Sequence, residues 1–138
     1  MTEEVNTRVV QDVYTAFRQG NVAAVLDAFS DVIEWHLPGS PEAIPWARTR
    51  RTRHEVAEFL EEFSKLLDVL AVHTNAFISQ GDKVVVLGSV TVRTKATGHE
   101  YTDHFAMVWT LKNGKIVGHR TYHDTARTGE AFRDLFRN

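Results

Sequence analysis

The segment from His99 to Asp124 constrains the fold more than any other part of the chain. Apolar and polar residues alternate over Tyr101–Leu111 and again over Ile116–Tyr122, and Asn113-Gly114 lies between the two runs. Alternation with a period of two is typical of a strand with one buried face, and an Asn-Gly pair between two such runs predicts a β-hairpin. We therefore expect a hairpin in which each strand turns one face toward the core.

The first strand of this hairpin places a carboxylate on an aromatic face. Asp103 shares its face with Tyr101, Phe105, Met107 and Trp109. A charge among apolar side chains is costly, so an unpaired carboxyl group in such a place tends to stay protonated. Asp103 is therefore a candidate for a neutral pocket acid. The alternative is a structural carboxylate bonded to a neighbour on the sheet.

The rest of the chain shows helical periodicity first and strand patterns later. We expect helices over Glu3–Gln19 and Val22–Phe29, a third helix that begins at the Thr52–Glu55 capping box, strands over Val32–Leu37, Val69–Ser79 and Lys83–Thr94, and a terminal helical turn over Gly129–Arg137. This order predicts an α+β fold, with helices against one face of a curved antiparallel sheet. A strongly curved sheet of this kind leaves a cone-shaped pocket, and ligand sites favour such mouths.

Composition limits the classes of function. The formal net charge of −2 predicts neither nucleic-acid nor membrane affinity, and the absence of cysteine excludes disulfide and thiolate chemistry. No apolar run approaches the roughly 20 residues of a membrane span, and Met1–Glu4 is acidic where a signal peptide would be basic. We expect a single domain over residues 1–138, located in the cytoplasm. The basic run Arg48, Arg50, Arg51 and Arg53 could meet an anionic ligand, but the acidic helix after it favours a solvated loop.

Several segments together resemble one superfamily. They are Val10–Gly20, Phe29–Gly39, Pro45–Phe59, Thr102–Phe105 and Asn113–Asp124. On these segments the chain resembles the SnoaL-like branch of the NTF2-like superfamily, which includes ketosteroid isomerases, polyketide cyclases and limonene-epoxide-type hydrolases. The resemblance implies a cone-shaped NTF2-like fold, a curved antiparallel sheet packed on three N-terminal helices. It also implies a homodimer formed through the outer face of the sheet.

The resemblance assigns roles residue by residue. Asp103, within Thr102–Phe105, matches the protonated acid in the oxyanion hole of the isomerases, and His36 falls at or beside their general base. The catalytic tyrosine of the isomerases falls at Val13. The last-strand acid of the polyketide cyclases falls at Thr121, and the pocket arginine of the epoxide hydrolases falls at Tyr101. The chain therefore carries parts of three known chemistries and the complete set of none.

A group of histidines is the other candidate for chemistry. His119, Thr121 and His123 share one face of the last strand, and the resemblance implies that this face points inward. With His36 they could polarise a carbonyl or position a water, and side chains at this spacing could also approach a metal, although no metal motif is present. The candidate catalytic residues are Asp103, His36 and His119, with no cofactor and no metal.

The predicted lining suits a flat or cyclic hydrophobic ligand. The predicted substrate-binding residues are Tyr14, Trp35, Trp46, Phe63, Tyr101, Phe105, Met107, Thr121 and His123. Two functions stay open at this point. The first is a cofactor-independent acid–base enzyme (an isomerase, cyclase, dehydratase or epoxide hydrolase) that acts on a small hydrophobic molecule. The second is a dimeric module that binds such a ligand without converting it.

Overall fold

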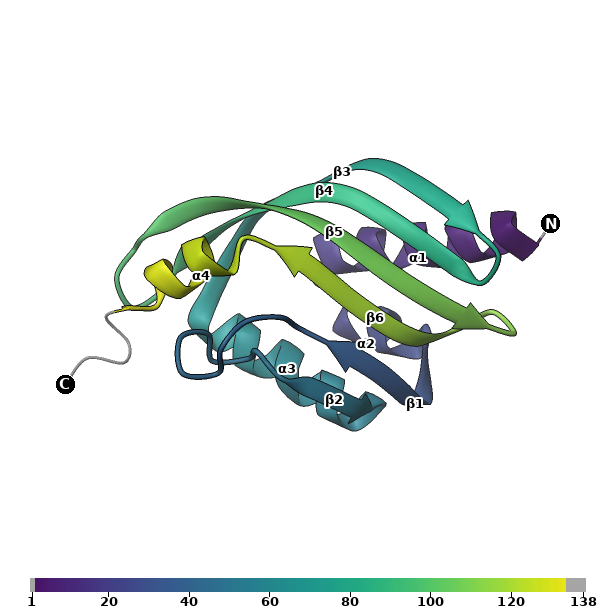
Figure 1. Cartoon of the computed structure of the whole chain (residues 1–138), viewed down its shortest axis with the longest axis horizontal. Coiled ribbons are helices and arrows are strands. Elements are labelled where there is room, and N and C mark those ends of the chain that lie inside the picture. The colour runs from purple at the N-terminus through teal and green to yellow at the C-terminus, as the bar shows by residue number, and fades with distance from the viewer. Residues whose placement is uncertain (1, 134–138) are drawn as a thin grey trace.

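Six strands form one sheet in the order β2-β1-β6-β5-β4-β3 (Figure 1). The computed structural model describes residues 2–133. The strands are β1 (Phe29–His36), β2 (Thr49–Thr52), β3 (Leu67–Gln80), β4 (Lys83–Thr94), β5 (Glu100–Lys112) and β6 (Lys115–His123). The helices are α1 (Thr2–Arg18), α2 (Val22–Asp27), α3 (Arg53–Leu66) and α4 (Thr125–Ala131). The expected α+β layout is therefore confirmed, with β2 as an additional strand.

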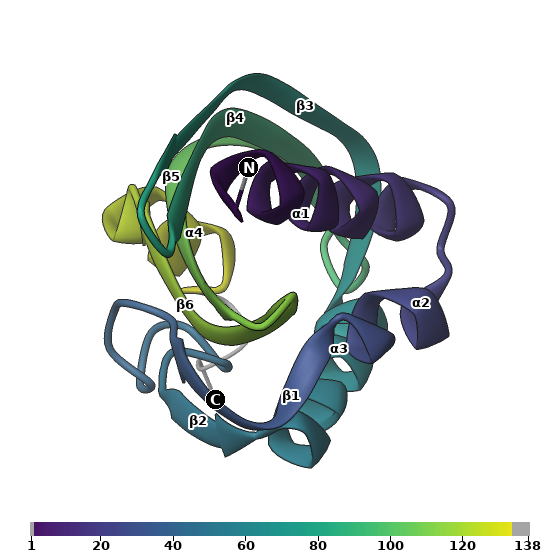
Figure 2. The ribbon, with the colours of Figure 1, turned by 90° about the vertical axis from the view of Figure 1, so that its right-hand side faces the viewer.

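The sheet is curved around the helices rather than flat. Figure 2 shows β3, β4 and β5 arching over α1, while α2 and α3 lie beside β1 on the other side of the ring. The pair β1–β6 is parallel, whereas the other neighbouring strands are antiparallel. The sheet expected as antiparallel is thus mixed at this one place, because the crossover through β2, α3 and the β3–β5 meander returns β6 beside β1 in the same direction.

The predicted hairpin is formed by β5 and β6. Asn113 and Gly114 have φ angles of 52° and 78°, the left-handed pair that a tight two-residue hairpin turn requires. Lys112 pairs with Lys115 next to the turn, and the register then shifts between Thr110 and Leu111. An extra residue on one strand moves every later side chain by one position. Because of this bulge, the inward-facing residues of β5 pair with alternate residues of β6, beginning at His119.

The third helix begins where the capping box predicts. The Thr52 hydroxyl accepts a hydrogen bond from the Glu55 N–H at 3.1 Å, and the Glu55 carboxylate accepts one from the Arg51 N–H at 3.0 Å. These contacts satisfy donors that the first turn of a helix leaves without intrahelical partners. The apolar stripe of α3 then packs inward through Val56 and Phe59.

Two of the expected helix boundaries were wrong. The second helix ends at Asp27, because Phe29 is the first residue of β1, and Val22, expected inward, is 49% exposed. The last helix begins earlier than Gly129, because the Asp124 carboxylate caps it by accepting from the Arg127 N–H at 3.1 Å. Leu135 and Phe136, expected on its apolar side, lie outside the described residues.

Arg50 corrects the expectation of a solvated basic loop. Its side chain is only 1% exposed and lies on the inner side of β2. Its Nη1 donates to the Trp46 carbonyl at 2.8 Å, and its guanidinium lies 4.9 Å from the centre of the Phe59 ring. The arginine is therefore part of the packing behind the aromatic wall described below. None of the described helices is long and apolar enough to cross a membrane.

Candidate active site

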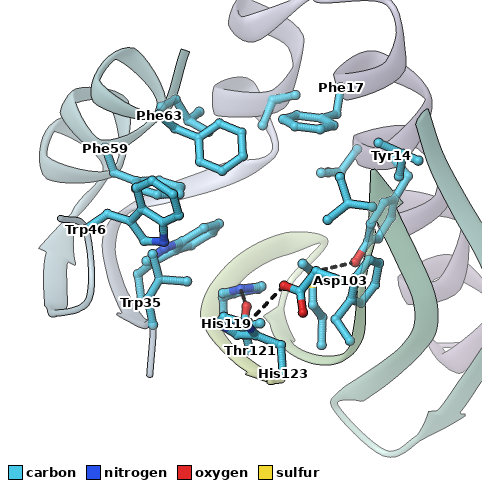
Figure 3. A pocket seen from close by; sticks show the side chains of 18 of the residues that line it. Tyr14, Phe17, Trp35, Trp46, Phe59, Phe63, Asp103, His119, Thr121 and His123 are labelled. Carbon is cyan, nitrogen blue, oxygen red and sulfur yellow. Dashed lines mark hydrogen bonds and ion pairs between the residues drawn. The ribbon is translucent and has the colours of Figure 1, made fainter. Parts of the chain in front are cut away.

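The concave side of the sheet and the helices enclose an apolar cavity of about 160 Å³. Its aromatic lining consists of Tyr14, Phe17, Phe29, Trp35, Trp46, Phe59, Phe63, Tyr101, Phe105 and Trp109. Its polar lining consists of Asp103, His119, Thr121 and His123, all from β5 and β6. Figure 3 shows these four polar residues gathered at one end of the cavity, away from Phe17 and Phe63.

Asp103 and His123 form a buried pair at this polar end. The Nδ1 atom of His123 lies 2.9 Å from Oδ2 of Asp103 (Figure 3). The Thr128 hydroxyl of α4 lies 3.4 Å from the same nitrogen. The second carboxylate oxygen, Oδ1, is buried without a hydrogen-bond partner among the described residues. A carboxylate at Nδ1 fixes the imidazole ring and leaves its Nε2 atom as the basic nitrogen when the ring is neutral.

This pair changes the expected role of Asp103. The sequence suggested a neutral acid because Asp103 lies among aromatic side chains, and it left open a carboxylate bonded to a neighbour on the sheet. In the structure Nδ1 of His123 lies 2.9 Å from Oδ2 of this carboxyl group. The carboxyl group of Asp103 therefore has an imidazole partner inside the apolar cavity. The geometry fits an Asp–His acid–base pair better than a lone protonated acid.

His119 is held as a neutral ring. Burial, together with the nearby charge of His36, lowers the pKa of His119 to about 3. The ring stacks on Trp35, with 4.0 Å between the ring centres, and also contacts Trp109. Its Nε2 atom lies 2.6 Å from the Thr121 hydroxyl. We assign the Thr121 hydroxyl as the donor in this bond, which places the imidazole proton on Nδ1.

Two ring nitrogens on the stacked pair Trp35 and His119 have no acceptor among the described residues. The Nδ1 atom of His119 and the Nε1 atom of Trp35 are both buried and lack hydrogen-bond partners among the described residues. Buried donors of this kind are costly unless a partner satisfies them. Because both rings line the cavity and stack on each other, these donors suit an oxygen atom of a bound molecule.

Tyr14 closes another side of the site as an uncharged phenol. Its hydroxyl donates to Sδ of Met107 at 2.9 Å and accepts from Nε1 of Trp109 at 3.2 Å. Burial raises the pKa of Tyr14, and burial also raises the pKa of Tyr101, with the nearby charge of Asp103 adding to the rise. Both tyrosines are therefore uncharged at neutral pH and act as lining or hydrogen-bonding groups.

The structure places most of the predicted site residues at the cavity. The predicted substrate-binding residues Tyr14, Trp35, Trp46, Phe63, Tyr101, Phe105, Met107, Thr121 and His123 all line it. Among the candidate catalytic residues, Asp103 and His119 line it and His36 does not. His36 follows the inward-facing Trp35, so it points to the outer side of β1, where its Nδ1 lies 3.0 Å from the Thr49 hydroxyl. The choice of His36 as a catalytic residue is therefore not supported by its position, because its side chain does not line the cavity.

Some cavity residues were not named from the sequence. Phe17, Phe59 and Leu60 come from the apolar stripes of α1 and α3, and helical periodicity identifies such residues as buried without telling core from cavity. The pairing of His123 with Asp103 was also missed, because it depends on the strand register. In the described part of the chain, no group of three or more His, Asp or Glu side chains is placed to hold a metal ion.

Comparison with solved structures supports the fold assignment. The chain is similar to an NTF2-like protein from Burkholderia xenovorans, with a TM-score of 0.83, 28% identity, and coverage of 94% of this chain and 96% of that chain. It is also similar to TerC, which was co-crystallised with polyporic acid, with a TM-score of 0.84, 26% identity, and coverage of 94% and 98%. A protein from Mesorhizobium loti, provisionally named a SnoaL-like polyketide cyclase, shares the fold with a TM-score of 0.70, 22% identity, and coverage of 83% and 96%.

The search of curated proteins found no match. The family comparison, in contrast, covers most of the chain, because the model of the SnoaL-like domain matches residues 10–119. This range contains α3, β1 to β5 and the first part of β6, so it includes Asp103 and His119. The chain belongs to the SnoaL-like domain family.

Proposed function

We propose that this protein is a cofactor-independent acid–base enzyme that acts on a small, hydrophobic, cyclic carbonyl compound. The observation that carries the proposal is the buried Asp103–His123 pair, with 2.9 Å between Oδ2 and Nδ1, at the polar end of an otherwise apolar cavity. A carboxylate or an imidazole can act as a general base, and a site from which bulk water is largely excluded favours this role. The cavity combines these two conditions.

The proposed reaction begins with removal of a proton from a carbon next to the carbonyl. The Nε2 atom of His123 takes the proton, and the Asp103 carboxylate stabilises the imidazolium that forms. The carbonyl oxygen gains negative charge, which the Nδ1–H of His119 and the Nε1–H of Trp35 stabilise by hydrogen bonds. Because the pKa of His119 is lowered to about 3, its ring donates as a neutral imidazole. Return of the proton to another carbon completes an isomerisation. In a cyclisation, the enolate carbon instead attacks a second carbonyl carbon of the same molecule, and the proton goes to the alkoxide that forms. In an elimination, the enolate expels a leaving group from the neighbouring carbon, and the leaving group takes the proton.

The similarity to known structures supports a small-molecule ligand. TerC, which is 26% identical, was co-crystallised with the small molecule polyporic acid. The wall formed here by Trp35, Trp46 and Phe59 suits a flat or cyclic molecule, because aromatic faces stack on rings. The family supports several chemistries on one fold, so the proposed acid–base step rests on the residues of this site.

An exchange experiment tests the proposal without knowledge of the natural substrate. Incubation of 2-tetralone with the protein in D₂O, followed by proton NMR, measures the exchange of protons next to the carbonyl. We expect exchange above the buffer rate with the wild type and background exchange with Asp103→Asn and His123→Gln. Equal exchange in the wild type and these variants would contradict the proposal. Binding of the ketone without exchange would favour the non-catalytic binding module.

We also propose that two copies pair through the outer face of the sheet. Leu87, Ala106 and Tyr122 are cross-strand neighbours on this face, and Leu87 and Tyr122 are 39% and 54% exposed. Val85 and Val108 form the next apolar pair beside them. An exposed apolar patch across three strands is typical of a surface that another protein surface covers, and a second copy offers the same patch.

A further inference from the structure

A second and larger cavity opens beside the first. It measures about 680 Å³ and lies between the end of α1, the turn into α2, the last part of α3 and the start of β3. The two cavities share the lining residues Phe17, Val25, Leu60, Phe63, Leu67 and Val72. Because the same side chains line both, the two spaces adjoin each other and these apolar residues form the boundary between them.

The boundary lies away from the polar end of the inner cavity. Figure 3 shows Phe17 from α1 and Phe63 from α3 on opposite sides of the opening, with Asp103, His119 and His123 at the other end. A molecule whose reacting group reaches the Asp103–His123 pair therefore has its remaining part directed toward Phe17 and Phe63. Phe17 and Phe63 also line the outer cavity, so a substituent longer than the inner cavity would extend toward that second space.

The outer cavity differs from the inner one in its charged lining. Arg18, Asp68 and Lys95 line it, whereas the inner cavity has Asp103 as its one acidic side chain and neither lysine nor arginine. Asp68 is paired with two cations, at 3.5 Å from Arg93 and 3.8 Å from Lys95. The positive groups around this cavity therefore outnumber the negative one.

Arg18 lines the outer cavity and has neutral hydrogen-bond partners. Its Nε donates to the Val72 carbonyl at 3.2 Å and its Nη2 to the Thr74 hydroxyl at 2.9 Å, and both acceptors are neutral. No ion pair among the described residues includes Arg18. These two hydrogen bonds hold the guanidinium at the outer cavity, so its position is set before an anion arrives.

Exposed apolar side chains surround the same cavity. Val22, Val69 and Leu70 line it and are all exposed to solvent. Exposed apolar groups that gather around an opening are typical of a ligand-binding groove. The rim is therefore suited to an aliphatic chain, and the cations beside it are suited to a negatively charged end.

We propose that the outer cavity is the entrance and a second binding subsite for a substrate that carries a short aliphatic chain ending in a carboxylate. The ring of this substrate occupies the inner cavity, the chain passes between Phe17 and Phe63, and the carboxylate meets Arg18 and Lys95. This inference deepens the proposed function and rests on it for the identity of the molecule in the inner cavity. It makes Arg18 and Lys95 specificity-determining residues.

Three transparent probes test the subsite: cyclohexanol, 4-cyclohexylbutanoate and 4-cyclohexylbutanamide. The chain has 3 tryptophans, and Trp35, Trp46 and Trp109 all line the inner cavity, so tryptophan fluorescence reports occupancy. We expect the butanoate to bind more tightly than cyclohexanol, by about fourfold for each methylene group that is buried. We expect it to bind about threefold more tightly than the amide, the usual scale for a solvent-exposed charge pair.

Charge variants separate the subsite from the inner cavity. The double variant Arg18→Gln/Lys95→Gln should bind the butanoate and the amide equally, while its affinity for cyclohexanol stays unchanged. Arg18→Lys keeps the charge and should retain the preference for the carboxylate. The matched control is Arg8→Gln, which removes the same charge from an exposed position of α1 outside both cavities.

Each result decides between defined alternatives. Three results would overturn the subsite. They are equal binding of the butanoate and the amide to the wild type, no binding of either, and a preference for the butanoate that persists in the double variant. Exchange of 2-tetralone protons does not depend on a charged tail. A carboxylate preference without exchange therefore removes the proposed catalytic function and leaves the subsite in place, and exchange without the preference removes the subsite alone.

Discussion

Asp103 and His123 are diagonal neighbours on β5 and β6, because His123 is the cross-strand partner of Phe105, which lies two residues from Asp103. Diagonal side chains on one face of an antiparallel pair come within reach of each other, which places Oδ2 and Nδ1 2.9 Å apart. The pair therefore depends on the strand register. The bulge between Thr110 and Leu111 sets that register, so a backbone feature outside the site determines whether the site forms.

Asp103→Asn should abolish proton exchange without emptying the cavity. The amide keeps the size of the side chain but cannot stabilise an imidazolium at His123, and loss of a general acid–base pair lowers rates by about 100-fold or more. Proton NMR with 2-tetralone in D₂O measures the rate, and tryptophan fluorescence measures cyclohexanol binding, which should stay within about threefold of the wild type. Asp82→Asn, on the exposed turn between β3 and β4, is the matched control. Undiminished exchange in Asp103→Asn would show that the carboxylate takes no part in the reaction.

The buried imidazole of His119 should make the protein less stable in mild acid. Its folded-state pKa of about 3 lies below the value of about 6.5 for an unfolded histidine, so the unfolded chain binds the proton more readily. This contribution is complete above pH 6.5 and is lost as the pH falls from 6.5 toward 3. Between pH 7 and pH 5 it amounts to about 2 kcal/mol of the free energy of unfolding.

Urea unfolding at pH 7, 6 and 5 checks this dependence. His119→Gln should reduce the loss of stability between pH 7 and pH 5 by about 2 kcal/mol, because glutamine does not titrate. His54→Gln, at an exposed position of α3, should leave the dependence unchanged. The same pH profile in the wild type and in His119→Gln would mean that protons enter the folded state at His119 without cost, which contradicts a buried neutral ring.

The inward face of β5 could be predicted from the sequence, whereas the pairing on β6 could not. Strict alternation around Asp103 identifies the face on which its side chain lies, and this does not depend on the register of the neighbouring strand. For β6, an unbroken register from the Asn113-Gly114 turn would place Arg120 and Tyr122 opposite the inward residues of β5. The bulge shifts the register by one residue, so His119, Thr121 and His123 face inward instead. No pattern in the sequence of β6 predicts this shift. Only the family resemblance indicated that His119, Thr121 and His123 face inward.

His36 and Arg50 show a second limit of the sequence. His36 is the last residue of β1, which has an irregular register between Val32 and Trp35, and Arg50 lies on β2, which consists of four residues with two arginines. Burial of Arg50 depends on contacts with Trp46 and Phe59, and both residues lie outside the strand whose alternation would be used to predict it. Side chains placed by tertiary contacts of this kind lie beyond the reach of periodicity.

Arg50 should stabilise the aromatic wall of the cavity from behind. Arg50→Ala removes the group that packs on Phe59 and one of the two donors to the Trp46 carbonyl, which also accepts from the Arg48 N–H, so we expect a loss of about 3 kcal/mol in the free energy of unfolding. Arg50→Met fills most of the volume and should cost about 1 kcal/mol. Chemical denaturation measures both. Arg51→Ala, on the exposed side of the same strand, should change stability by less than about 0.5 kcal/mol, and an equal effect at both positions would contradict a special role for Arg50.

A charge on the outer face of the sheet should separate the two copies of the proposed dimer. Leu87 and Tyr122 both neighbour Ala106, so Leu87→Glu or Tyr122→Glu places a carboxylate at the centre of the apolar patch. In a symmetric dimer the same charge appears twice at the interface, and burying it is costly without a partner.

Light scattering after size-exclusion chromatography should give the mass of a dimer for the wild type and of a 15.7 kDa monomer for the variants. Val5→Glu introduces the same charge at an exposed position of α1 and should leave the dimer intact. Because the outer face and the cavity occupy opposite sides of β5, monomeric variants should still bind cyclohexanol, and a wild-type protein that is already monomeric would exclude this interface.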